Sequence, residues 1–136
     1  MSLTTFFSEP ARVAGLIVFL SIFVGVSLRK KRRVHPPFMI TCFVTDLALV
    51  LYLEFSRGAV ETTVGRMTTE LAIHVALATV SLMLYVFLIM TGRKVLKGDD
   101  SIKPRHFRLA IAFLFVRTAV LVTAIWASAT MPPVMP

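Results

Sequence analysis

The stretch LAIHVALATVSLMLYVFLIMTG, residues 71–92, contains no Asp, Glu, Lys or Arg and is long enough to cross a membrane. A helix needs about 20 mostly apolar residues to span the hydrocarbon core, where backbone hydrogen bonds must close within the segment. Three more apolar segments of similar length occupy residues 11–28, 36–54 and 107–128. The sequence therefore predicts an all-α membrane protein, a single domain folded as a four-transmembrane-helix bundle.

The composition favours the lipid bilayer as the environment of the chain. Hydrophobic residues make up 57% of its 136 residues, which is more than a soluble domain carries. The net charge of +8 comes from cations gathered in two short loops, not from an exposed basic arm or surface. This distribution argues against nucleic acid as a partner.

The basic residues also predict the orientation in the membrane. Residues 29–35 contain five Lys and Arg side chains, and residues 93–108 contain six. The opposite ends of the predicted helices carry only Arg12, Arg57 and Arg66. By the positive-inside rule, both basic loops face the cytoplasm and both termini lie on the outer side.

Two charged residues inside the predicted spans have matching positions. Asp46 follows His35 by eleven residues, and Arg117 follows His106 by eleven. Eleven residues make about three helical turns, so each pair shares one helix face. Both helices start at the basic surface, so the equal offsets place Asp46 and Arg117 at one depth near mid-membrane. We predict that these helices are neighbours and that the two charges pair, to fix helix register or to take part in proton transfer or substrate binding.

A looser polar group is predicted near the outer surface. Glu54 lies at the outer end of the second helix, and Glu70 precedes His74 by four residues on the third. Residues four apart share a helix face. Such a group can hold a metal ion, or it can simply form a polar cap at the interface.

His35 and His106 are predicted to lie at the same depth on neighbouring helices. Two imidazoles in this arrangement can supply both axial ligands of a b-type haem. Arg33, Arg105 and Arg108 would then lie near the haem propionates at the cytoplasmic surface. The alternative is that both histidines only contact lipid headgroups.

The order of these features resembles that of a family of small four-helix bacterial membrane proteins of unknown function, implicated in the assembly of haem-copper cytochrome oxidases. Three runs carry the resemblance: VHPPFMITCFVTDLALVLYLE (34–54), ELAIHVALATVSLMLYVFLIMTGR (70–93) and KPRHFRLAIAFLFVRTAVLVTAIW (103–126). His35, His74 and His106 match three recurrent histidines of that family. The fourth family histidine has no counterpart in YLEFSRGAVETT (52–63), which leaves His74 without its expected partner.

The resemblance implies a location and a role. It implies a multi-pass protein of the bacterial cytoplasmic (inner) membrane that binds or handles haem b. The role would be in respiratory oxidase assembly or in electron transfer.

Two other functions stay open at the level of the sequence. The chain has almost no mass outside its spans, as expected of a non-catalytic accessory subunit of a larger membrane complex, including a respiratory complex. Copper handling at the outer face is the other, because Met67, His74, Met131 and Met135 all lie on that side and thioethers suit Cu(I). The sequence carries no phosphate-binding loop, metalloprotease motif or activated nucleophile, so binding is expected rather than catalysis.

Overall fold

The computed structural model describes residues 10–57 and 68–130, and within these ranges it consists of helices joined by short turns. The four long helices are α2 (Pro10–Ser27), α3 (His35–Arg57), α5 (Thr69–Leu96) and α6 (Lys103–Thr130). One-turn 3-10 helices, η1 (Leu28–Lys30) and η2 (Asp100–Ile102), lie in the two basic turns. All four long helices are long and apolar enough to cross a membrane, which confirms the predicted helical architecture.

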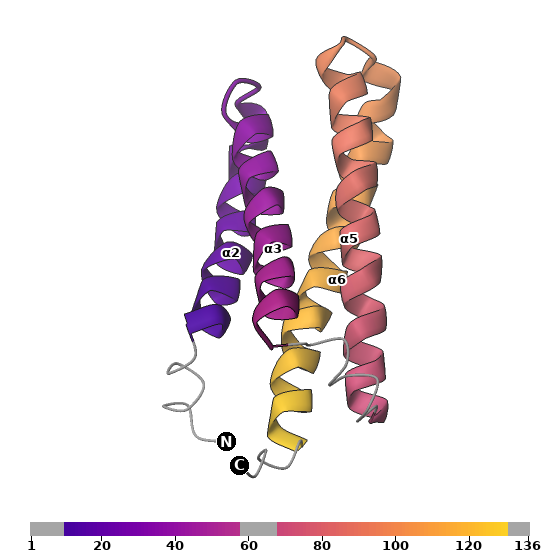
Figure 1. The fold of residues 1–136 in the computed structure, drawn as a ribbon. Coiled ribbons are helices and arrows are strands. Elements are labelled where there is room, and N and C mark those ends of the chain that lie inside the picture. Colours follow the sequence, from indigo (N-terminus) through magenta and orange to yellow (C-terminus); the bar gives the residue numbers. More distant parts are fainter. Residues whose placement is uncertain (1–9, 58–67, 131–136) are drawn as a thin grey trace.

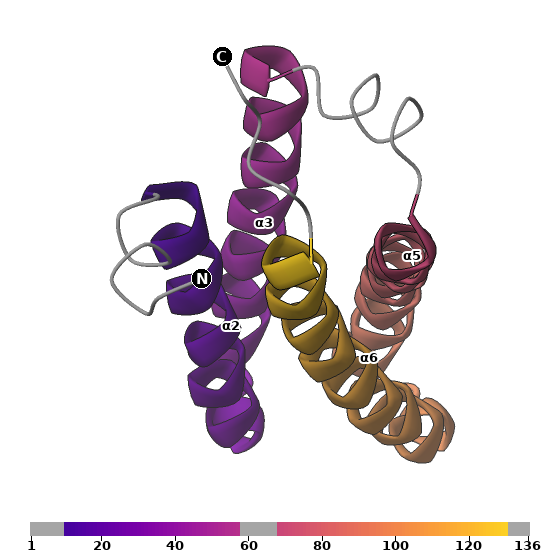
Figure 2. The ribbon, with the colours of Figure 1, turned by 90° about the horizontal axis from the view of Figure 1, so that it is seen from below.

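The helices form two antiparallel hairpins, α2–α3 and α5–α6 (Figure 1). Both basic turns lie at one end of the bundle, and the start of α2 and the end of α6 lie at the other. Contacts within each hairpin are far more extensive than contacts between the hairpins. Seen from the end opposite the basic turns, α6 lies between α5 and the α2–α3 pair (Figure 2).

The second hairpin turn is tighter than predicted. Helix α5 continues to Leu96 and α6 already begins at Lys103, so much of the basic segment 93–108 is helical. Gly98 has φ of +96°, the left-handed conformation that commonly follows a helix C-terminus. Pro104 fits the first turn of α6 because the backbone amides there have no helical partner to lose. These residues let the chain reverse within a few positions.

The core lies where the four helices meet. Its buried members come from every long helix: Val18 and Ile22 from α2, Cys42 from α3, Tyr85 from α5 and Phe113 from α6. The Tyr85 ring centroid lies 4.5 Å from that of Phe113. It also lies 4.8 Å from the ring centroid of Phe43, which belongs to α3. This cluster of tilted aromatic rings joins the two hairpins near the middle of the bundle.

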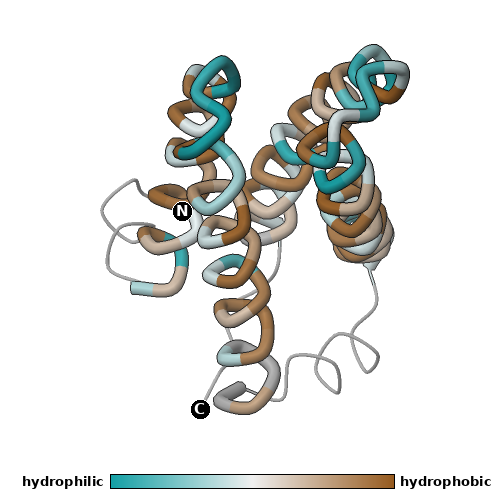
Figure 3. The backbone as a smooth tube through the Cα atoms, turned by 90° about the horizontal axis from the view of Figure 1, so that it is seen from above, coloured by the Kyte–Doolittle hydropathy of each residue, from teal (hydrophilic) through white to brown (hydrophobic). Residues whose placement is uncertain are grey.

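Most residues along the helices are hydrophobic, and the hydrophilic residues gather at the turns (Figure 3). Large side chains such as Leu20, Val44, Met83 and Phe115 are more than half exposed. Exposed apolar surface of this extent is unfavourable in water and is favourable against lipid tails. The exterior therefore suits a bilayer, as the length and composition of the helices also indicate.

Helices α2 and α3 are in close contact at Gly25. A Cβ atom at this position would overlap the Met39 sulfur and lie 3.0 Å from the Phe38 ring. Gly15, ten residues earlier on α2, has open space where its Cβ would be. Close packing of α2 on α3 thus depends on one glycine and not on the other.

We expect Gly25→Ala to lower the unfolding midpoint of the purified protein, because the new methyl group pushes α2 from α3. Overpacking of this kind costs about 1–3 kcal/mol. Gly15→Ala is the matched control and should leave the midpoint unchanged or raise it, because alanine favours helix over glycine. Thermal unfolding in detergent measures both, and equal effects of the two variants would contradict the packing described here.

Candidate functional site

The two hairpins are joined at mid-bundle by an ion pair. Arg117 Nη2 on α6 donates a hydrogen bond to Asp46 Oδ1 on α3 at 2.6 Å. The two side chains are only 14% and 7% exposed, respectively. The structure thus brings together the two charges whose equal offsets from His35 and His106 predicted a pairing.

Further polar atoms are buried around this pair. Tyr85 Oη lies beside Asp46 without a regular hydrogen bond, and Ser81 Oγ, one helical turn earlier on α5, has no partner among the described residues. Both residues are only 2% exposed. Arg117 Nε is also buried without an acceptor in the described part of the protein. Buried polar atoms normally find partners, so this cluster marks the polar centre of an otherwise apolar bundle.

His35 is fixed against its own hairpin. Its Nδ1 lies 2.7 Å from the carbonyl oxygen of Gly25, near the end of α2. Carbonyl groups in the last turn of a helix have no helical donor, so this oxygen is available. A carbonyl oxygen can only accept, which means that Nδ1 carries the proton. In the neutral imidazole, Nε2 is then an unprotonated nitrogen with a lone pair.

His106 has the same tautomer for a different reason. Its Nδ1 lies 2.8 Å from Thr91 Oγ1 on α5. Thr91 Oγ1 also lies 2.8 Å from the carbonyl oxygen of Phe87, to which it donates its only proton. With that proton on the backbone carbonyl, the hydroxyl accepts from His106 Nδ1, and in the neutral imidazole Nε2 then holds the lone pair. Gly92 makes room for the ring, since a Cβ there would lie 3.3 Å from His106 Cε1.

His74 repeats this arrangement at the other end of the hairpin. Its Nδ1 lies 3.1 Å from Thr123 Oγ1 on α6, and that hydroxyl donates to the carbonyl oxygen of Ala119 at 2.8 Å. His74 Nε2 is again the unprotonated nitrogen. All three histidines thus hold Nδ1 in a hydrogen bond within one hairpin and keep the lone pair of Nε2.

The two His–Thr contacts of α5 and α6 are related by a local twofold arrangement, which the sequence analysis missed. Thr91 follows His74 by 17 residues on α5, and Thr123 follows His106 by 17 residues on α6. Because the two helices are antiparallel, one register brings both His–Thr pairs into contact. The two contacts then lie about 25 Å from each other along the helix axis. The equal spacing was visible in the sequence, but it has meaning only once the two helices are known to be antiparallel neighbours.

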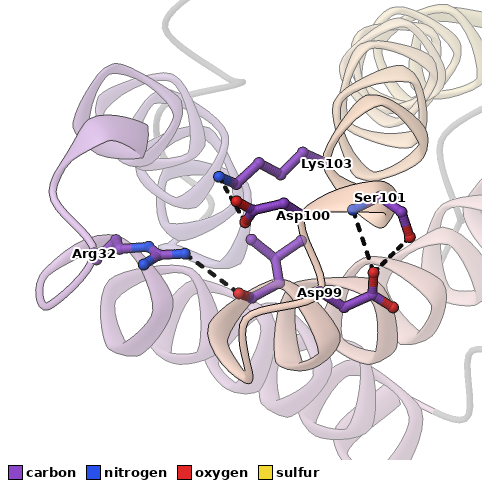
Figure 4. Close-up of polar contacts among 6 residues, drawn as sticks. Arg32, Asp99, Asp100, Ser101 and Lys103 are labelled. Atoms are coloured by element: carbon purple, nitrogen blue, oxygen red, sulfur yellow. Dashed lines mark hydrogen bonds and ion pairs between the residues drawn. The ribbon is translucent and has the colours of Figure 1, made fainter.

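The basic end is held together by contacts between the turns. Arg32 Nη2 donates to the carbonyl oxygen of Val95 at 3.4 Å, across the gap between the hairpins (Figure 4). The Arg29 guanidinium lies 5.8 Å from the centroid of the Phe107 ring, a cation–π contact. His35 is close enough to His106 to influence it electrostatically. The arginines predicted to meet haem propionates are exposed at this end: Arg33, Arg105 and Arg108.

Only part of the predicted outer metal group lies within the described residues. No three His, Cys, Asp or Glu side chains come close enough to hold a metal ion there. Glu70 and His74 both lie on α5. The side chain of Glu54 lies outside the described residues, and so do the predicted copper-binding methionines, Met67, Met131 and Met135.

No protein-family model, curated protein or solved structure matches the chain. The resemblance to the small oxidase-linked family therefore stays a hypothesis, based on the positions and spacing of His35, His74 and His106.

Removing one member of the Asp46–Arg117 pair should be strongly destabilising, because it leaves a buried charge without its partner. We expect Arg117→Met or Asp46→Leu to cost about 3–5 kcal/mol, and the double variant to recover most of that loss. Thermal unfolding in detergent of the parent protein, the two single variants and the double variant gives the coupling free energy between Asp46 and Arg117.

The exposed ion pair between Lys103 and Asp100, at 2.7 Å, provides the control. Lys103→Met should leave the unfolding midpoint unchanged, because solvent screens this pair. Additive effects of the two mid-bundle substitutions would show that Asp46 and Arg117 do not stabilise each other.

Proposed function

We propose that the chain is a haem-binding membrane protein in which His35 and His106 supply the two axial ligands of a b-type haem. One observation carries the proposal. Each imidazole is oriented through Nδ1 by a partner in its own hairpin, and each keeps the Nε2 lone pair that a metal requires. The two residues belong to different hairpins at the same end of the bundle.

The chemistry of the surrounding groups fits such a ligand pair. Histidines that bind metals commonly donate their other N–H to a carbonyl or another acceptor, which fixes the ring and raises its basicity. The Gly25 carbonyl and the Thr91 hydroxyl would do this for His35 and His106. Bound haem would supply one-electron redox chemistry whose potential depends on these ligands.

The positive charge of the basic turns supports the same site. A haem carries two propionates, and exposed arginines near the site would neutralise them. Arg33 precedes His35 by two residues, and Arg105 and Arg108 flank His106. The contacts of Arg29 and Arg32 would meanwhile keep the two histidine-bearing ends together.

The proposal includes an orientation and a role. By the positive-inside rule, the excess of Lys and Arg in the two turns would put these turns in the cytoplasm and both termini on the outer side of the bacterial inner membrane. The resemblance described above connects the chain with respiratory oxidase assembly or electron transfer. Other membrane subunits would then be its partners.

A second candidate is an accessory subunit without a cofactor. The observation that favours it is that the hydrogen bonds of His35 and His106 already tie α2 to α3 and α5 to α6. In that case the histidines stabilise the hairpins and have no other task. The two candidates differ in one measurable property, the visible spectrum.

Protein produced with ample haem should show a Soret band and, when reduced, an α-band. We expect His35→Ala and His106→Ala each to remove the α-band, because each deletes one axial ligand. His74→Ala should keep the spectrum, because His74 lies at the opposite end of α5. A flat spectrum of the parent protein would favour the accessory subunit.

The positioning hydrogen bonds can be tested apart from the ligands. Thr91→Val removes the acceptor for His106 Nδ1 and should weaken haem binding about 10–100-fold, with a shifted midpoint potential. The matched control is Thr118→Val, since the Thr118 hydroxyl bonds only the carbonyl of Leu114 on its own helix. Haem titration of the two variants should separate them, and equal affinities would contradict the role of Thr91.

The proposed orientation can be tested with cysteine labelling. Cys42 is the only cysteine and is buried, so a cysteine introduced on the surface dominates the reaction with a maleimide. We expect Ser101→Cys, in the turn between α5 and α6, to react with a membrane-impermeant maleimide only after the cells are opened. Labelling of Ser101→Cys in intact cells would show that this turn faces outward and would contradict the proposed orientation.

A further inference from the structure

A half-open cavity of about 300 Å³ lies between the four helices, toward the end opposite the basic turns. Each long helix contributes to its walls, so the cavity belongs to the interface between the hairpins and not to either hairpin alone. It is separate from the proposed haem ligands, because neither His35 nor His106 lines it. Figure 2 shows the bundle from the end nearest this space.

The walls of the cavity are mostly apolar. The side chains include Leu16, Phe19, Leu49, Val120 and Leu121. An apolar protein cavity of roughly 150 Å³ admits benzene, and ligand pockets begin near 300 Å³. The space therefore fits a compact apolar body of about eight to ten carbon atoms.

Charged groups are placed on one part of these apolar walls. Arg12, Asp46 and Arg117 all line the cavity, together with His74. The Asp46–Arg117 pair is therefore part of the cavity wall.

The Arg117 guanidinium has unused donors. It has five N–H groups, and only one of them, on Nη2, bonds the Asp46 carboxylate. The others have no acceptor among the described residues. A guanidinium favours a carboxylate as an acceptor, because two parallel N–H groups match the two oxygens.

From these observations we propose that the cavity binds an amphipathic monocarboxylate, such as a medium-chain fatty acid, with the carboxylate at Arg117 and the apolar body among the helices. The depth argues against a phospholipid headgroup. Arg117 lies eleven residues from His106, about 16 Å along α6 from the basic end, which is near the middle of a bilayer core of about 30 Å. A headgroup would stay at the surface, whereas a small carboxylate can enter.

Octanoate is a suitable probe, and octan-1-ol, with the same chain length and no charge, is its control. Thermal unfolding is measured in a detergent with an uncharged head group. We expect octanoate to raise the unfolding midpoint by about 9 °C at a hundredfold excess over its dissociation constant. Octan-1-ol should give a much smaller shift. Equal shifts, or no shift with octanoate, would overturn the proposal.

A cavity-filling variant locates the binding site without disturbing the charge pair. Gly15 lines the cavity, and a Cβ atom there meets nothing within 4 Å, so Gly15→Leu should fold while occupying the space. This variant should lose the octanoate response. Ala76→Leu, an exposed position on α5, is the matched control and should keep it. A full response in Gly15→Leu would place the octanoate elsewhere and overturn the proposal.

Discussion

The arrangement of the bundle depends on the need to neutralise Asp46 and Arg117 inside a membrane. Each charge alone would be costly at that depth, and each hairpin carries one of them. Their hydrogen bond therefore selects which faces of α3 and α6 meet. The aromatic cluster of Tyr85 with its neighbours on α3 and α6 lies beside the pair. The ion pair and the packing of the aromatic rings thus both stabilise the same contact between the two hairpins. Elsewhere the hairpins make few contacts with each other.

The three histidines of the protein share one hydrogen-bonding arrangement. The three histidines lie on three different helices, and each is oriented through Nδ1. The partners differ, a helix-end carbonyl for His35 and threonine hydroxyls for His74 and His106, yet the outcome is one tautomer. A common tautomer with a lone pair on Nε2 is what connects a purely structural hydrogen bond with the proposed axial ligation.

Much of this fold could be predicted from the sequence, because the length of apolar runs decides the number of spans. The spacing of Asp46 and Arg117 from the two basic turns also predicted their contact, since helical rise converts residue number into depth. The roles of Thr91 and Thr123 could not be predicted in this way. A threonine in an apolar helix usually bonds its own backbone, and its second role depends on the side chain that the neighbouring helix places opposite it. The longer α5 and α6 were missed because charged residues at helix ends look like loop in a hydropathy pattern.

The two His–Thr contacts have a consequence for how the bundle can move. Both depend on one antiparallel register, and they lie near opposite ends of the α5–α6 hairpin. Sliding or rotation of one helix along the other would break both hydrogen bonds together. The α5–α6 hairpin should therefore move as one rigid unit. Motion of the two hairpins relative to each other then takes place at the interface of α5 and α6 with α2 and α3. The Asp46–Arg117 hydrogen bond is the point about which one hairpin can tilt against the other. The cavity lies at that interface, so a small tilt of one hairpin against the other would change the volume of the cavity while leaving both hairpins intact.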